Sequence, residues 1–152
     1  KTFLSDSRVD PNRQDNEGRE PLHWAAGNGK TDVVKTLLSN GRMNPDRKDR
    51  EGRTPLIWAA RNGHTDVVKT LLSDGKVYPE RQDNYGRTPL SWTALNGHTE
   101  VVKTLLSDGR VEPDRRDNYG RTALSRAAQN GHTEVVKTLL SDGRVEPDTH
   151  RL

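Results

Sequence analysis

The amino-acid sequence predicts an all-α repeat solenoid, in which helix-turn-helix units stack along one axis. The first observation is a 34-residue period: Gly-Arg pairs recur 34 residues apart, at Gly18, Gly52, Gly86 and Gly120. Second, each period contains two short segments whose apolar residues have helical spacing. Third, only 29% of the 152 residues are hydrophobic, which disfavours one large core and favours a thin core along an elongated fold.

The period divides residues 1–152, which we interpret as a single solenoid domain, into four full units and two partial ones. The full units are 8–41, 42–75, 76–109 and 110–143. We expect residues 1–7 to be the end of a preceding repeat and residues 144–152 to be the start of a truncated one. Neither has the polar outer face of a capping repeat, so the chain is predicted to be a segment of a longer array.

The first helix of a unit is predicted after a Thr-Pro pair, as at Thr54, because threonine is a good N-cap and proline suits the first helical position. Its apolar stripe is narrow and rich in alanine, and in the second unit it consists of Leu56, Ala59 and Ala60. The Asn-Gly pair that begins at Asn62 predicts the end of this helix.

The second helix is predicted to have Thr65 as its N-cap, and Asp66 in its first turn suits the positive end of the helix dipole. Its apolar residues share one face, and in the second unit they are Val67, Val68, Leu71 and Leu72. Gly75 is expected in the left-handed conformation just past the helix end. Residues 76–87 are expected to form the turn that crosses to the next unit.

No unit can bury its apolar face alone. Stacking would bury the valines and leucines of one unit against the leucine and alanines of the next. The gain is about 25 cal/mol per Å² of apolar surface, so at least about three units are needed for stability. We therefore expect nearest-neighbour coupling along the array, with fraying at its ends.

Composition excludes several classes of protein. The chain has no cysteine, which excludes disulfides and cysteine-based zinc sites. No apolar run approaches the roughly 18 residues of a membrane span, and we expect a cytoplasmic protein. Lys and Arg number 25 against 22 Asp and Glu, a net charge of +3, which is a mixed surface rather than a basic one. Neither GxxxxGK[ST] nor GxGxxG occurs, so we predict no cofactor and no enzymatic activity.

The stretch from Asp49 to His64 reads D-R-E-G-R-T-P-L-I-W-A-A-R-N-G-H. It resembles the ankyrin repeat signature D-x-x-G-x-T-P-L-H-x-A-A-x-x-G-H, which is followed by V-V-x-x-L-L and a glycine. The match recurs four times. The resemblance implies an L-shaped solenoid in which β-hairpin fingers project on one side, inner helices line a concave face and outer helices form the back. It also implies a protein-protein interaction scaffold without chemistry of its own.

The units depart from the ankyrin signature at some positions, and these departures point to a smaller group of ankyrin arrays. Its histidine is present only as His23, which weakens a family network of hydrogen bonds between fingers. The Trp-Ala-Ala variant and the near-identical units are similar to the ankyrin arrays of fungal NACHT-type (NOD-like) immune receptors. That similarity implies, as the alternative function, a ligand-sensing module attached to a signalling domain.

The units differ mainly at the finger tips and along the first helix, and we expect these positions to form one contiguous surface for a protein partner. Two other interpretations remain open: the tryptophans fill gaps between inner helices, and the variation is neutral drift on a solvated face. The predicted partner-binding residues are Glu17, Trp24, Arg50, Glu51, Ile57, Trp58, Arg61, Asn84, Tyr85, Ser91, Trp92, Leu95, Asn118, Tyr119, Ser125, Arg126 and Gln129.

Two sets of polar residues, histidines and aspartates, recur in register. The histidines that end each signature are too far apart along the stack to share a metal ion, and we expect each to bond to backbone. The aspartate that opens each signature is expected to brace a finger turn. These residues are His64, His98 and His132, and Asp15, Asp49, Asp83 and Asp117.

Two arginine ladders, which include Arg19 and Arg47, indicate ion pairs between units, because each arginine has an acidic neighbour. Binding of a nucleic-acid backbone is the less favoured alternative. A further possibility is end-to-end self-association through Phe3, Leu4 and the unpaired last repeat.

Overall fold

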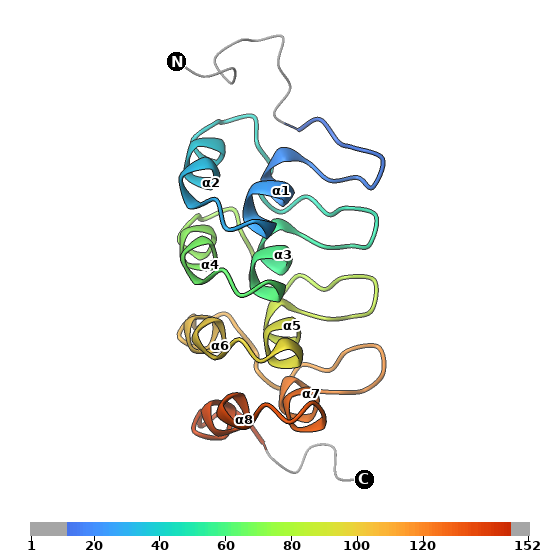
Figure 1. Cartoon of the computed structure of the whole chain (residues 1–152), viewed down its shortest axis with the longest axis vertical. Helices are drawn as coiled ribbons and strands as arrows, with labels where there is room; N and C mark the ends of the chain where they lie inside the picture. The colour runs from blue at the N-terminus through green and yellow to red at the C-terminus, as the bar shows by residue number, and fades with distance from the viewer. Residues whose placement is uncertain (1–11, 147–152) are drawn as a thin grey trace.

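The computed structural model describes residues 12–146, and within this range the chain forms eight helices in four pairs (Figure 1). Their bounds are α1 Pro21–Gly27, α2 Thr31–Leu38, α3 Pro55–Arg61, α4 Thr65–Leu72, α5 Pro89–Asn96, α6 Thr99–Leu106, α7 Ala123–Gln129 and α8 Thr133–Leu140. The predicted all-α solenoid with its 34-residue period is confirmed.

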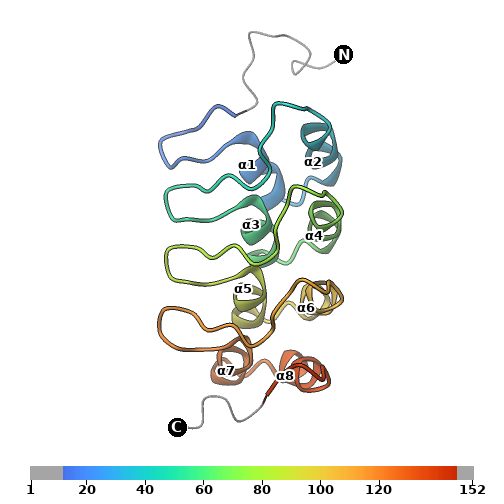
Figure 2. The ribbon, with the colours of Figure 1, turned by 180° about the vertical axis from the view of Figure 1, so that it is seen from behind.

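The helices form two parallel layers. The inner layer is α1, α3, α5 and α7, and the outer layer is α2, α4, α6 and α8; each helix packs against its neighbours in the same layer and against its partner within the unit. Figures 1 and 2 show the loops between units projecting beside the inner layer. We call these projecting loops the fingers; the last three are residues 39–54, 73–88 and 107–122.

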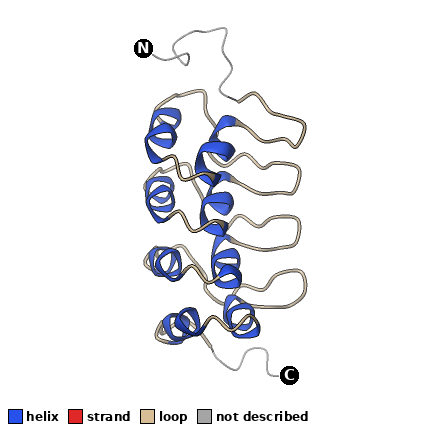
Figure 3. Cartoon of the chain, in the orientation of Figure 1, coloured by secondary structure: helices blue, strands red, loops and turns tan. Residues whose placement is uncertain are grey.

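The fingers are not β-hairpins, and this expectation was wrong. Residues 12–146 contain no strand, and Figure 3 shows the fingers entirely as loops. In the second finger, two backbone bonds close the tip: Asp49 N–H donates to Arg53 O at 2.9 Å and Gly52 N–H donates to Asp49 O at 3.0 Å. The N–H groups of Glu51 and Arg53 donate instead to the Asp49 carboxylate at 2.9 Å. A side chain thus takes the donors that a strand ladder would need.

The inner helices α3 and α5 begin as predicted, whereas α1 has Glu20 at its N-cap position. The backbone N–H of Ile57 donates to Thr54 Oγ1 at 3.2 Å, and Pro55 is the first residue of α3. Thr88 caps α5 in the same way. In the fourth unit Thr122 still caps α7, although alanine replaces the proline.

The ends of the outer helices differ from the prediction. His64, not Thr65, occupies the N-cap position of α4, and Thr65 is the first helical residue. The left-handed glycine lies before this helix rather than after it: Gly63 has φ of 78°, whereas Gly75 has no positive φ. A Cβ on Gly63 would lie 2.6 Å from His98 Nδ1, so the close approach of the next unit also requires glycine there.

The core follows the predicted apolar stripes, except that Val33 of α2 and Leu140 of α8 are about half exposed. Leu56, Ala59 and Ala60 of α3 are fully buried against the neighbouring units, as are Val67, Val68 and Leu71 of α4. Leu72, the last predicted position, is only partly buried. The stack is therefore held together by burial between units rather than by one central core.

Candidate functional site

The inner surface, which we define as the finger tips together with α1, α3, α5 and α7, is organised by one aspartate per finger. Oδ2 of Asp49 accepts the indole N–H of Trp58 at 2.9 Å, while Oδ1 holds the finger turn. Asp83 holds Trp92 at 2.8 Å and its own turn in the same way. The predicted role of these aspartates as turn braces is confirmed, and each also anchors a tryptophan.

Arginine and tryptophan alternate along the inner surface. The Arg19 guanidinium lies 5.4 Å from the Trp24 ring centre and 4.9 Å from that of Trp58. Arg53 lies 5.2 Å from Trp58 and 5.0 Å from Trp92. Arg19 and Arg53 thus each lie between the tryptophans of two successive units, whereas Arg87 lies near Trp92 and Tyr85. Such cation–π contacts contribute about 0.5–2 kcal/mol each. This row of alternating tryptophans and arginines therefore helps to hold successive units together.

The same arginines face the aspartates of the following fingers. Nε of Arg19 lies 3.9 Å from Asp49 Oδ2, and Arg53 lies at the same distance from Asp83. The predicted ion pairs between units are therefore present. Since these cations already have partners, the ladder gives no support to nucleic-acid binding.

A second ladder of ion pairs runs along the bases of the fingers. Arg47 pairs with Glu20 of the preceding unit at 3.0 Å, and Arg115 pairs with Glu80 at 2.7 Å. Burial is the largest influence on Glu80 and raises the pKa of its carboxyl, although the Arg115 guanidinium opposes that rise. The sequence indicated these pairs without identifying the acid that each arginine reaches.

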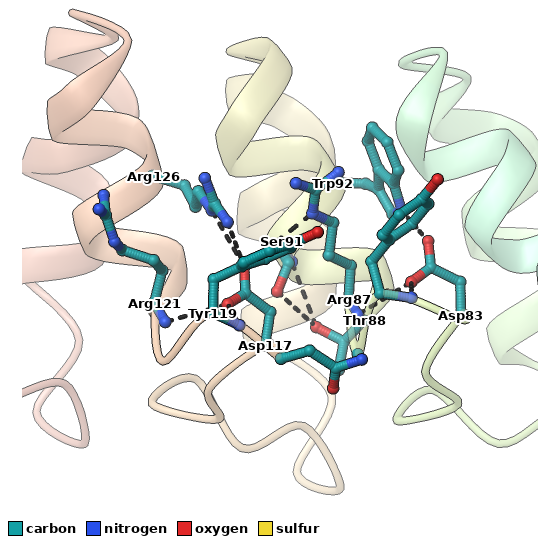
Figure 4. A network of polar contacts seen from close by, with 12 residues as sticks. Asp83, Arg87, Thr88, Ser91, Trp92, Asp117, Tyr119, Arg121 and Arg126 are labelled. Atoms are coloured by element: carbon teal, nitrogen blue, oxygen red, sulfur yellow. Dashed lines mark hydrogen bonds and ion pairs between the residues drawn. The ribbon is translucent and has the colours of Figure 1, made fainter.

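The row ends differently in the fourth unit, as Figure 4 shows. Arg126 stands where the other units have tryptophan, and its Nη2 and Nε lie 2.7 and 3.0 Å from Asp117 Oδ2. Burial acts to raise the pKa of Asp117, but the backbone N–H of Arg121 and the Arg126 guanidinium outweigh it, so the pKa lies below its usual value. Tyr119 packs over Arg126, 5.8 Å from its guanidinium.

The histidines hold successive units together through the backbone. Nε2 of His64 lies 3.0 Å from Gly27 O, and His98 and His132 make the equivalent contacts with Arg61 O and Leu95 O at 2.9 Å. The prediction that these side chains bond to backbone is confirmed. His23 links its unit to the next finger through a 3.1 Å contact with Arg53 O.

The structure brings most of the predicted partner-binding residues to the inner surface. The exposed ones are Glu17, Trp24, Arg50, Asn84, Tyr85, Asn118, Tyr119 and Gln129. Partly exposed ones are Glu51, Trp58, Arg61, Leu95, Ser125 and Arg126.

Three predicted residues are buried instead. Ile57 packs in the interior between units, and Ser91 bonds to the cap residue Thr88 at the start of α5. Trp92 is only 6% exposed, and the guanidinium groups of Arg53 and Arg87 lie 5.0 and 4.9 Å from its ring centre. We therefore remove all three from the partner-binding surface, and for Trp92 the packing interpretation holds.

Sequence reasoning missed a pocket on this surface. It has a volume of about 100 Å³, enough for several water molecules. Its lining is Arg19, His23, Trp24, Gly27, Asn28, Trp58 and Asn62. The available signal was the glycine at position 27, where the other units have larger residues.

Two further observations concern residues 12–146. In this range no group of three or more His, Asp and Glu residues is placed to hold a metal ion, and no helix is long and apolar enough to cross a membrane. Phe3, Leu4 and residues 147–152, on which end-to-end association partly rests, lie outside the described range. That association stays a prediction.

Comparison with known proteins agrees with the geometry. The family model described as "Ankyrin repeats (3 copies)" matches residues 1–83 and 75–150. A comparison with curated proteins gave no match. Ankyrin repeats are in general protein-protein interaction modules and typically lack catalysis. The narrower similarity to fungal NOD-like receptors has no support from the comparisons. The match extends over nearly all of the sequence, and the chain belongs to the ankyrin repeat family.

Proposed function

We propose that this chain is a protein-binding scaffold, the recognition segment of a larger intracellular protein, and that it binds its partner through the inner surface. The observation that carries the proposal is where the units differ. At one finger-tip position they have Glu17, Glu51, Tyr85 and Tyr119. The outer helices, in contrast, all read T-D-V-V-K-T-L-L or T-E-V-V-K-T-L-L. The side chains of the inner surface therefore differ from unit to unit, whereas those of the outer layer are nearly the same in every unit.

Large aromatic side chains on the inner surface support the proposal. Trp24 is 49% exposed, Tyr85 42% and Tyr119 61%. Each leaves apolar area in water that a partner would bury, at about 25 cal/mol per Å². Tyrosine, tryptophan and arginine are also the residues most enriched among binding hot spots. Exposed amides and carboxylates on the same surface, such as Asn118 and Glu17, add hydrogen-bonding groups.

Affinity capture with matched variants tests the proposal. The bait is the chain itself, and the inner-surface variant carries Tyr85→Ala, Tyr119→Ala and Gln129→Ala, all at exposed positions. Removal of two hot-spot aromatics should weaken binding by about 10²-fold or more, so the partner should be lost from this variant. Captured proteins are identified by mass spectrometry, and the affinity of the leading one is then measured by calorimetry.

The control variant changes the outer layer by the same number of residues. Lys69→Ala, Lys103→Ala and Lys137→Ala are exposed on α4, α6 and α8. The proposal requires that this control retain the partner while its circular dichroism and that of the inner-surface variant match the unchanged chain. Equal retention by both variants would move the binding site off the inner surface.

A further inference from the structure

The pocket in the first unit exists because one position along the inner helices lacks a side chain. Successive units have Gly27, Arg61, Leu95 and Gln129 there. Gly27 is the last residue of α1, and a Cβ added to it would lie 3.7 Å from Trp58 and Asn62, an ordinary contact distance. The backbone therefore accepts a side chain at this position, and its absence leaves the space beside the Trp24 and Trp58 rings open.

The next unit shows what fills the equivalent space. There the walls are Trp58 and Trp92, and the Arg61 guanidinium lies 5.5 Å from the first ring centre and 5.1 Å from the second. The finger arginine Arg53 contacts the same two rings. Two guanidinium groups thus share one pair of tryptophans. In the first unit Arg19 is in place between its tryptophans, and the second guanidinium is missing.

The carboxylate that balances the charge of Arg61 in the second unit also has an equivalent in the first unit. Burial is the main influence that lowers the pKa of Arg61, the Arg53 charge lowers it further, and the Glu51 carboxylate opposes both. Glu51 also pairs with Arg53 at 2.9 Å. Glu17 occupies the position of Glu51 in the first finger, is exposed, and makes no ion pair within residues 12–146. Glu17 does not itself line the pocket. By the 34-residue repeat it corresponds to Glu51, whose charge acts on Arg61, so it is the carboxylate that we expect to balance an added cation.

We infer that the pocket at Gly27 binds the guanidinium group of an arginine side chain supplied by the partner protein, in the place that Arg61 fills in the next unit. The inserted group stacks between the faces of Trp24 and Trp58, with Glu17 as its counter-charge. This inference rests on the proposed function, since it names the chemistry that the inner surface recognises.

The first test uses the three tryptophans as reporters, because each has one indole N–H signal in ¹H–¹⁵N correlation spectra. Nα-acetyl-arginine amide is titrated into the labelled chain. The Trp24 and Trp58 signals should move along a saturable curve with a dissociation constant of about 1–10 mM, the weak affinity expected of one side chain. The Trp92 signal should not move. Nα-acetyl-citrulline amide, which has a similar shape without the charge, should leave all three signals in place.

Two variants make the test specific to the pocket. Gly27→Arg supplies the guanidinium from the chain and should abolish the response of Trp24 and Trp58. Arg61→Gly opens the equivalent space in the next unit, so the Trp92 signal should now respond as well. Absence of a saturable response in the unchanged chain, an equal response to the citrulline compound, or an undiminished response in folded Gly27→Arg would overturn the inference.

The Gly27→Arg variant also allows this inference to be tested separately from the proposed function. If the partner found by affinity capture is lost from both Gly27→Arg and the tyrosine variant, the pocket and the inner surface are both used. If Gly27→Arg retains the partner while the tyrosine variant loses it, the inference fails and the proposed function stands. Substitution by lysine of the partner's inserted arginine should cost the interaction at least tenfold, because a compact ammonium cannot stack between two rings as a planar guanidinium does.

Discussion

At the residue scale, the aspartate of each finger accepts hydrogen bonds both from the backbone of its own turn and from a side chain of the following inner helix. Asp117 lies at the centre of this arrangement in the fourth unit: Oδ1 accepts the backbone N–H groups of Tyr119 and Arg121 at 2.9 and 3.0 Å. Oδ2 accepts the Arg126 guanidinium, and the side chain is fully buried. The N–H groups and the guanidinium around this buried carboxylate favour its ionised form, so its protonation should destabilise the folded chain.

The free energy of unfolding should depend on pH in a way that reflects the ionisation of Asp117. The folded-state pKa of Asp117 lies below its unfolded value, so its contribution is complete above about pH 5 and is lost as pH falls through the folded-state pKa. Asp117→Asn should therefore destabilise the chain by about 1–3 kcal/mol at pH 6, and the difference from the unchanged chain should shrink toward pH 3. Urea denaturation across this range measures it. A difference that stays constant down to pH 3 would contradict the assignment.

At the element scale, helices were predicted well because their signals are local. Thr54 and the proline after it set the start of α3, and the spacing of Val67, Val68 and Leu71 placed the buried face of α4 correctly. The N-cap of α4 was misplaced for a physical reason. His64 takes that position because its ring reaches the carbonyl of Gly27 in the preceding unit, a contact that local propensity does not contain.

The features that depend on neighbouring units were the hardest to predict. Ile57 and Ser91 were expected at the surface because they vary, yet both are buried in the stack. The β-hairpin was expected from the family resemblance, and the aspartate side chain replaced its ladder. The pocket at Gly27 required knowing that Arg61 fills the same space one unit later.

Removal of one histidine should show how strongly adjacent units are coupled. His98 bridges to Arg61 O at 2.9 Å and also packs closely on Gly63. His98→Ala removes one of the two side-chain donors to that carbonyl, the other being Asn96 Nδ2 at 2.9 Å. We expect a loss of about 1 kcal/mol. Urea denaturation gives the value. Lys103→Ala, an exposed change on α6, is the matched control and should stay within about 0.5 kcal/mol. Equal effects of the two changes would show that the bridge does not couple the units.

At the scale of the whole molecule, burial is greatest in the middle of the described stack. Leu72 and Leu106 are partly buried by the units that follow them, whereas Leu140, their equivalent in α8, is 48% exposed. Val68 and Val102 are fully buried, and the equivalent Val136 is only partly so. Stability in such an array is a sum of unit terms and interface terms.

Hydrogen exchange should follow this gradient. Backbone amides of α4 and α6 are expected to exchange at least about tenfold more slowly than those of α8, because their opening breaks two interfaces instead of one. Exchange measured by NMR at a single pH gives the comparison between equivalent amides, such as those of Leu71, Leu105 and Leu139. Uniform protection across the three helices would indicate that the described units unfold together.

The alternation of tryptophan and finger arginine has a consequence for how such an array can change in length. Arg19 and Arg53 each lie near the tryptophan of their own unit and near the tryptophan and aspartate of the next unit. Duplication or deletion of the second unit in frame would therefore leave the arginine before it with a tryptophan and an aspartate ahead. Growth and shortening preserve the scaffold while changing which finger tips stand next to one another.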